Sequence, residues 1–75
     1  MTTQLRDLLI RYQSKGHVVF VRTRKMTVSL DGHRDITLGQ ALIKLKAWET
    51  AILDPIIDTR GCSRDTARVH AGIGL

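Results

Sequence analysis

Residues 26–40 read Met-Thr-Val-Ser-Leu-Asp-Gly-His-Arg-Asp-Ile-Thr-Leu-Gly-Gln, and this stretch predicts a β-hairpin that leads into a helix. Apolar and polar side chains alternate over residues 26–30, as in a strand with one buried face. Asp31-Gly32 favours a two-residue hairpin turn, so residues 33–36 are expected to fold back on that strand. The final Thr-Leu-Gly-Gln has the spacing of a capping box, in which the Thr caps the helix and the Gln reaches back to it.

A helix from residue 38 to residue 53 is expected after this hairpin. Its apolar residues recur at helical spacing and cover one arc. They are Leu38, Ala41, Leu42, Leu45, Trp48, Ile52 and Leu53. Glu49 falls within the arc, so either the helix rolls to expose it or it pairs with a base such as Lys46 or Arg22. Asp54-Pro55 is expected to end the helix, because the residue before a proline disfavours the α region; the alternative is a further turn that starts at Pro55.

The residues before position 26 predict one more helix and one more strand. Apolar side chains at i, i+3, i+4 and i+7 form one stripe over residues 4–15, with Thr3 as the N-cap and Gly16 at the C-terminal end. The stripe consists of Leu5, Leu8, Leu9 and Tyr12. Val18 to Val21 form a continuous β-branched and aromatic run, which predicts a buried strand.

The predicted fold class is α+β, a small α-β-β-β-α domain in which an antiparallel meander is covered on one face by two helices. Seventy-five residues make one domain near the lower size limit for a self-sustaining core. We expect the compact domain to span residues 1–58 and a basic C-terminal tail to span residues 59–75. Ser63 can cap a short helix from Arg64 to Ala71 that ends at Gly72; a flexible tail is the alternative.

Positive charge is concentrated in the first third of the chain. The net charge is +5, and between Arg11 and Lys25 there are five bases and no acid. On a folded scaffold such a block attracts phosphate or an acidic protein surface. The alternative is that the charge only keeps a small protein dissolved. The candidate binding residues are Arg11, Lys15, Arg22, Arg24, Lys25, Arg60, Arg64 and Arg68.

Arg22 and Arg24 are the strongest of these candidates. Two residues apart in an extended chain, they point to the same face at a spacing of roughly 6–7 Å, which suits two neighbouring phosphates or carboxylates. A solvated strand edge is the alternative. Phe20 and Trp48 are expected in the core, so the sequence offers no aromatic platform on which bases could stack.

The arginines of the tail, Arg60, Arg64 and Arg68, recur every four residues and would form one stripe on a helix. Gly61 and Cys62 interrupt the first turn of that helix, which favours an unstructured basic tail. A tail of this kind can become ordered on an anionic partner.

The sequence predicts no enzyme, no cofactor and no metal site. The residues considered as ligands are His17, His33, His70 and Cys62. Cys62 and His70 are eight residues apart with no second close pair, which fits no zinc pattern. No nucleophile–base or paired-carboxylate arrangement is present either. A lone cysteine, the absence of a leader pattern and the absence of a long apolar stretch predict a cytoplasmic protein without membrane contact.

Two functions fit these observations. The first is a small regulator that contacts nucleic acid through its basic patch. The second is an inhibitor, of a kind frequent among phage and mobile-element proteins, that binds and blocks a larger host complex such as a nucleic-acid-targeting defence machine. Ile43 points away from the apolar arc of its helix and is a candidate contact with such a partner, or with a second copy in a homodimer. We favour the first function.

Overall fold

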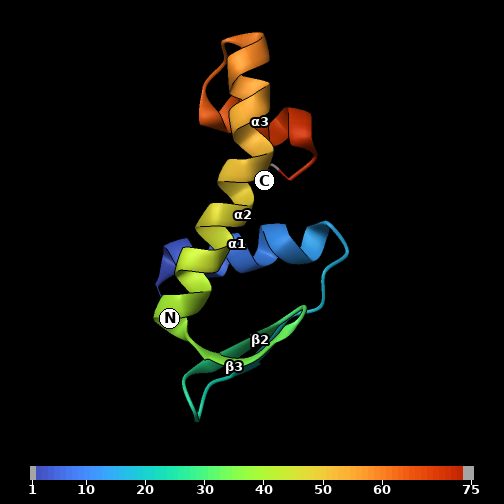
Figure 1. The fold of residues 1–75 in the computed structure, drawn as a ribbon. Coiled ribbons are helices and arrows are strands. Elements are labelled where there is room, and N and C mark those ends of the chain that lie inside the picture. The colour runs from blue at the N-terminus through green and yellow to red at the C-terminus, as the bar shows by residue number, and fades with distance from the viewer. Residues whose placement is uncertain (1, 74–75) are drawn as a thin grey trace.

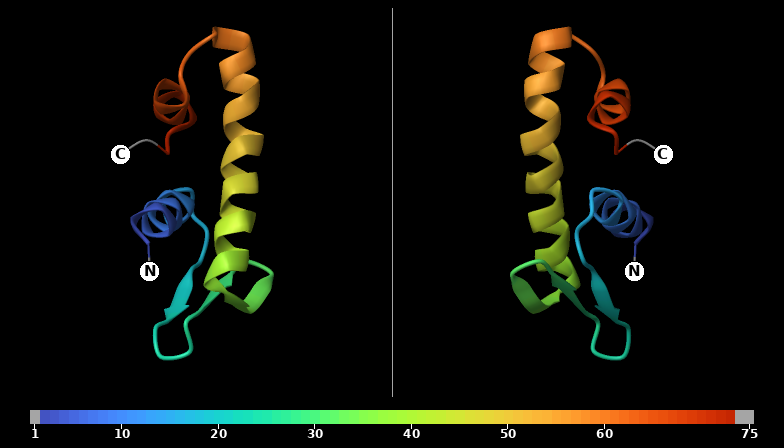
Figure 2. Two further views of the ribbon diagram at one scale, coloured as in Figure 1. Left: turned by 90° about the vertical axis from the view of Figure 1, so that its left-hand side faces the viewer. Right: turned by 90° about the vertical axis from the view of Figure 1, so that its right-hand side faces the viewer.

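The computed structural model describes residues 2–73 and shows a long central helix with a small sheet at one end (Figure 1, Figure 2). The elements in chain order are α1 (Thr3–Ser14), β1 (Phe20–Arg22), β2 (Thr27–Leu30), β3 (His33–Thr37), α2 (Leu38–Arg60) and α3 (Arg64–Ala71). The predicted α+β class and element order are therefore confirmed. The molecule is elongated, measuring 42 × 23 × 19 Å. None of the helices described between residues 2 and 73 is long and apolar enough to cross a membrane.

The three strands form an antiparallel meander with β2 in the centre. The predicted turn at Asp31-Gly32 is confirmed, because the residues on either side of it pair with each other. Gly32 supplies the positive φ of +76° that the turn needs. Thr37 and Gln40 form the predicted capping box, so the last residue of β3 is also the N-cap of α2. This direct connection fixes the start of α2 against the sheet.

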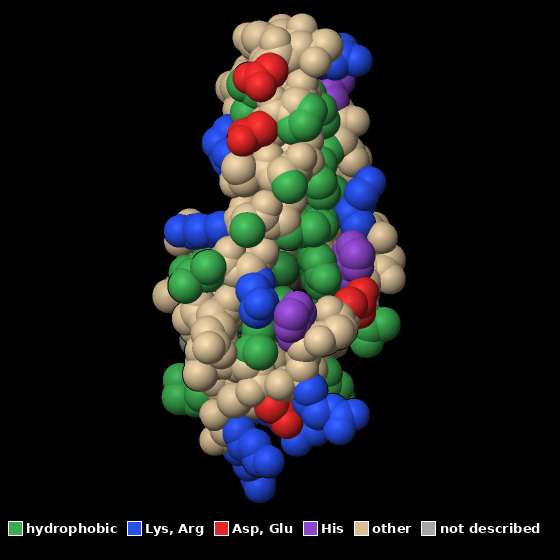
Figure 3. Space-filling model, in the orientation of Figure 1, with side chains coloured by type: hydrophobic (Ala, Val, Ile, Leu, Met, Phe, Trp, Pro, Cys, Tyr) green, Lys and Arg blue, Asp and Glu red, His purple; other side chains and the backbone are tan. Residues whose placement is uncertain are grey.

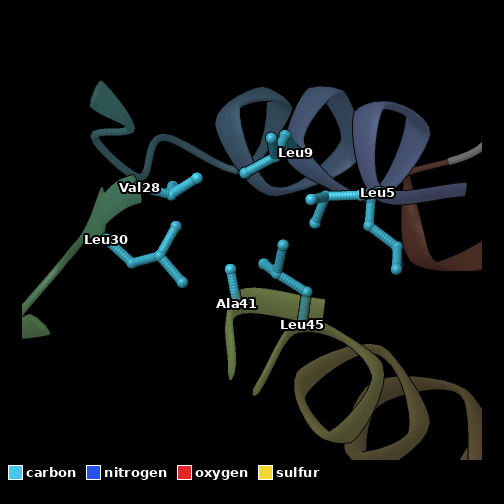
Figure 4. Packing of buried hydrophobic residues seen from close by; sticks show 7 residues of the cluster. Leu5, Leu9, Val28, Leu30, Ala41 and Leu45 are labelled. Carbon is cyan, nitrogen blue, oxygen red and sulfur yellow. The ribbon is translucent and has the colours of Figure 1, made fainter. Parts of the chain in front are cut away.

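One face of the sheet, α1 and the start of α2 enclose the first of two apolar clusters (Figure 4). Its buried residues are Leu5, Leu8, Leu9, Val28, Leu30, Ala41 and Leu45. The sequence periodicity assigned all seven to buried faces. Burial of a side chain the size of Leu or Val stabilises the fold by about 1.5–3 kcal/mol, so this cluster holds α1 and the sheet onto α2.

α1 meets the middle of α2 through two aromatic rings. Tyr12 packs against the first cluster and Trp48 against the second, and their rings meet edge to face with centroids 4.9 Å apart. Both rings are partly buried, as expected for core aromatic residues. The N-cap of α1 is Thr2 and not Thr3 as predicted, because the hydroxyl of Thr2 accepts the N–H of Leu5.

β1 is an edge strand with exposed apolar side chains, so the predicted burial of Val18 to Val21 is wrong. Val18 is 73% exposed and Phe20 is 59% exposed; Val19 alone among the four packs against the first cluster. The strand also begins later than predicted, at Phe20. The physical reason is that α2 packs mainly on β2 and β3, which leaves the β1 edge uncovered.

α2 does not end at Asp54-Pro55, as the sequence predicts, but runs to Arg60 with the proline inside it. A proline within a helix removes one backbone hydrogen bond and strains the preceding turn. Here the apolar face continues past the proline, with Leu53 fully buried and Ile56 packed beside it. Packing therefore outweighs the local preference, and the helix ends at Gly61, whose φ of +64° is left-handed.

α3 lies beside the second half of α2 (Figure 2). Residues 64–71 form a helix with Ser63 as its N-cap and Gly72 as its C-cap, so the favoured expectation of an unstructured basic tail is wrong for this segment. The buried centre of the second apolar cluster is formed by Leu53, Ala67 and Ile73. The expected boundary at residue 58 falls inside α2, and the segment after it is packed on the rest of the molecule.

Shortening Leu53 tests this packing of α3. Because its side chain is fully buried, Leu53→Ala is expected to lower the free energy of unfolding by about 3 kcal/mol, measured by urea denaturation followed by circular dichroism. Ile43→Ala on the same helix is the matched control, since Ile43 is 70% exposed and its loss should change stability by less than about 0.5 kcal/mol. A loss below about 1 kcal/mol for Leu53→Ala would contradict the packing of α3 on α2.

Candidate functional site

The eight basic residues singled out from the sequence are not gathered on one face but fall into three settings. Arg22, Arg24 and Lys25 lie at the sheet end of the molecule, Arg11, Arg64 and Arg68 surround Glu49, and Lys15 and Arg60 belong to neither group. The first setting is an exposed surface, which we call the turn patch and define as residues 20–26. The second is an ion cluster built around a buried carboxylate.

The β1–β2 turn projects from one end of the molecule (Figure 1). The N–H of Met26 donates to the carbonyl of Thr23 at 3.3 Å, which closes the turn. Arg24 and Lys25 occupy its two middle positions and are exposed. Because β1 ends at Arg22, the expectation that Arg22 and Arg24 share one face of an extended strand is wrong. Neither Arg24 nor Lys25 forms an ion pair with any residue from 2 to 73. Figure 3 shows Lys and Arg side chains grouped at this end, so the turn displays two cations that are not neutralised by the protein.

Arg22 is held on the outer face of the sheet by two contacts. Its Nε lies 3.3 Å from Oδ1 of Asp35, and its guanidinium carbon lies 5.6 Å from the ring centroid of Phe20, within the range of a cation–π contact. Asp35 is itself fixed, because its N–H donates to Oγ of Ser29 at 3.1 Å. The guanidinium of Arg22 is therefore held in place by contacts within the protein, and Asp35 offsets part of its positive charge.

Phe20 presents an exposed aromatic ring on the open face of the sheet, so the expectation that it belongs to the core is wrong. Phe20 pairs with Ser29 across β1 and β2. It therefore lies on the face opposite Val28, which is fully buried, because successive strand residues alternate between faces. A shallow hollow of about 420 Å³ is lined by residues 20–25. The prediction that no aromatic ring is exposed for base stacking is therefore also wrong.

Glu49 lies buried in the middle of α2, only 2% exposed, and three arginines donate hydrogen bonds to its carboxylate. Nη1 of Arg11, from α1, lies 3.0 Å from Oε2. From α3, Nη2 of Arg64 and Nη2 of Arg68 lie 3.1 Å and 2.9 Å from Oε1. One carboxylate therefore connects all three helices.

The charge of Glu49 is stabilised by these arginines. Burial by itself raises the pKa of its carboxyl group, because the charged form is separated from water. The hydrogen bond and charge of Arg68, the charge of Arg11 and the hydrogen bond of Arg64 act in the opposite direction and prevail, so the pKa lies below its ordinary value. Glu49 is therefore ionised at neutral pH and serves as a structural ion.

The remaining sequence candidates lie elsewhere. Nζ of Lys15 donates to the carbonyl of Ala71 at 3.0 Å, which ties the end of α1 to the end of α3. Arg60 is the exposed last residue of α2. Ile43 is 70% exposed and so is free to contact a partner, but it lies on α2 and not in the turn patch.

His17 has a structural setting at the start of the segment that leads into β1. Its Nδ1 lies 2.8 Å from Oδ2 of Asp31, and its ring stacks on Tyr12 with centroids 4.1 Å apart. The hydrogen bond from His17 and that from the N–H of Val18 hold the pKa of Asp31 below its ordinary value. Between residues 2 and 73, no group of three or more His, Cys, Asp or Glu side chains is placed to hold a metal ion.

Comparison of the chain with models of protein families, with curated proteins and with solved structures finds no match.

The partners of Glu49 differ from those expected. The sequence predicts exposure of Glu49, or pairing with Lys46 or Arg22, and both alternatives are wrong. The available signal was the spacing of Arg64 and Arg68, which are four residues apart and share one face of a helix. A carboxylate inside an apolar arc and a pair of arginines on a second helix together indicate a buried ion pair, provided that the second helix is assigned.

Replacement of Glu49 by glutamine is expected to change how stability depends on pH. A carboxyl group whose pKa is lower in the folded state than in the unfolded state stabilises the fold when the pH is above the unfolded-state pKa. This stabilisation is lost as the pH falls through the folded-state pKa. Glu49→Gln should therefore be about 3 kcal/mol less stable than the wild type at pH 7. The difference in stability between the two proteins should become smaller below pH 4.5, because 4.5 is the ordinary pKa of a glutamate carboxyl group.

Urea denaturation between pH 2.5 and pH 7 measures this difference. Asp58→Asn is the matched control, because Asp58 lies on the same helix, is exposed and forms no ion pair with residues 2–73. It should follow the wild-type curve within about 0.5 kcal/mol. A constant offset between Glu49→Gln and the wild type over the whole pH range would show that the carboxylate is not stabilised as the structure indicates.

Proposed function

We propose that the protein is a non-enzymatic regulator that binds single-stranded nucleic acid through the turn patch, residues 20–26. The observation that carries the proposal is the ring of Phe20 on the open face of the sheet, 59% exposed although the guanidinium of Arg22 lies over it. Bases of single strands stack on exposed aromatic side chains of this kind. Because the base is unpaired, it is free to reach the ring.

The cations around Phe20 support the same function. Arg24 and Lys25 are exposed and form no ion pair with any residue from 2 to 73, and together with Phe20 they line the same shallow hollow. A strand with a base on Phe20 would place its phosphates within reach of the turn. A groove that combines stacking with positive charge binds single strands with little sequence preference, which suits a hollow built from only six residues.

The lone thiol of Cys62, which forms no disulfide, is typical of proteins in reducing compartments. It supports a cytoplasmic site of action, as the sequence predicts.

A second function is favoured by the apolar residues of the same surface. Val21 and Met26 of the turn patch are exposed, and interface cores combine apolar residues with arginine. This combination fits an inhibitor that blocks an acidic or nucleic-acid-binding surface of a larger complex, as a phage or mobile-element protein would. The two functions differ in what they require of Phe20: stacking requires an aromatic ring, whereas protein contact requires only an apolar side chain.

Substitutions of Phe20 separate the two functions. Phe20→Leu keeps an apolar side chain but removes the ring, and Phe20→Tyr keeps the ring. Because stacking of one base contributes about 1–3 kcal/mol, Phe20→Leu should weaken binding of a labelled 12-nucleotide single strand about 5- to 150-fold. Phe20→Tyr should bind like the wild type. Fluorescence anisotropy with single-stranded RNA, single-stranded DNA and a duplex of equal length measures all three proteins.

The salt dependence and a charge variant complete this experiment. With three phosphates contacted, the logarithm of the affinity should fall with the logarithm of the salt concentration at a slope of about −2. Arg24→Gln combined with Lys25→Gln should reduce that slope, whereas Lys44→Gln, an exposed lysine of α2, should not. If no single strand binds at micromolar protein, or if Phe20→Leu and Phe20→Tyr bind alike, the proposal is contradicted. The inhibitor function would then take its place if the charge variant also lost capture of a protein partner.

A further inference from the structure

The three helices enclose a partly open cavity of about 470 Å³ beside the Glu49 ion cluster. α1 contributes its first three turns to the wall, α2 contributes the residues around Glu49, and α3 contributes Arg64 and Arg68. This volume lies in the range of small-molecule sites, about 300–1,000 Å³. The cavity lies away from the turn patch and does not depend on the proposed function.

The wall of the cavity carries more positive than negative charge. Its charged residues are Arg11, Lys46, Arg64, Arg68, Asp7 and Glu49. Four bases face two acids, which leaves a net charge of +2. Asp65 lies outside the wall, is 91% exposed and takes one hydrogen bond from Arg68, so it offsets part of the excess from the solvent side.

The number of arginines exceeds what the buried carboxylate needs. A single guanidinium can satisfy a carboxylate with two parallel hydrogen bonds, yet three guanidinium groups converge on Glu49. Nε of Arg11 is buried and has no hydrogen-bond partner in the described part of the chain. Arg64 keeps nearly half of its side chain exposed. Part of the Arg64 guanidinium side chain therefore remains accessible from the cavity while it also contacts Glu49.

Uncharged groups of the wall have the chemistry of an oxyanion site. Thr3 and Thr50 contribute hydroxyl groups, which donate to oxygen ligands as readily as they accept. Lys46 lines the cavity without an ion pair to any residue from 2 to 73. An excess of two positive charges favours a doubly charged ligand over a singly charged one, since the attraction is proportional to the charge.

From these observations we infer that the cavity between α1, α2 and α3 binds a phosphate group, with Lys46 and Arg64 as its main cationic contacts. The phosphate can be free or can be esterified to a small molecule, for which the volume beyond one phosphate leaves room. Because Lys46 lies on α2 and Arg64 on α3, the bound group would also connect these two helices next to Glu49, so its binding would stabilise their packing.

Isothermal titration calorimetry at constant ionic strength tests this inference with two probes, inorganic phosphate and ribose 5-phosphate. Lys46→Gln is the decisive variant, because it removes a charge from the wall without touching Glu49. Lys44→Gln is its matched control, two residues away on α2 and outside the cavity. We expect Lys46→Gln to weaken phosphate binding at least fivefold and Lys44→Gln to leave it unchanged. Arg64→Gln should weaken it at least as much as Lys46→Gln does.

The two probes distinguish the source of the phosphate. Tighter binding of ribose 5-phosphate than of inorganic phosphate would identify an ester as the ligand, and the reverse order would identify the free ion. No binding of either probe at 10 mM would overturn the inference. Equal losses for Lys46→Gln and Lys44→Gln would overturn it as well, because they would show attraction to net charge alone. Phe20→Leu should bind phosphate like the wild type, so failure here is distinguishable from failure of the proposed function.

Discussion

The arrangement of the helices depends on the ion pairs of the buried Glu49 carboxylate. Glu49 lies on α2 between Leu45, which belongs to the first apolar cluster, and Leu53, which belongs to the second. An ionised group in such a place is tolerated only when its partners satisfy it, and removal of one partner is strongly destabilising. Here the partners come from α1 and from α3. The same ion pairs that offset the burial of Glu49 therefore also hold the two shorter helices against the long one.

This arrangement decides which cations are left for function. Three of the eight basic residues that the sequence offers for binding are directed at Glu49, and Lys15 is directed at a carbonyl of α3. Of the candidate residues at the sheet end, Arg24 and Lys25 in the β1–β2 turn remain exposed without an ion pair to residues 2–73, near the exposed ring of Phe20. A short, single-layer sheet with an uncovered edge is what exposes that ring. The exposure of Phe20 thus follows from the small size of the apolar core, which does not extend to this side of the sheet.

Local signals in the sequence predicted the local structure well. The Asp31-Gly32 turn, the capping box at Thr37 and the caps of α3 each depend on a few neighbouring residues, and each is found. Apart from the N-cap of α1, which lies one residue earlier than predicted, the errors concern interactions between distant residues. The apolar run at Val18 to Val21 does not indicate that its strand lies at the edge of the sheet. The residues around Pro55 do not indicate that packing against α3 allows α2 to continue beyond the proline. For the candidate site, Arg24 and Lys25 were identified as exposed cations, whereas the exposure of Phe20 and the partners of Glu49 required the tertiary arrangement.

The most direct test of the central role of Glu49 is a pair of double-mutant cycles at pH 7, both built on Glu49→Gln. One cycle adds Arg11→Gln, on α1, and the other adds Arg68→Gln, on α3, with the free energy of unfolding measured for each protein. If one carboxylate joins both helices to α2, each cycle should show a coupling of at least about 1 kcal/mol. Losses that add within about 0.3 kcal/mol in either cycle would contradict the account, because the corresponding helix would then be held by apolar packing alone.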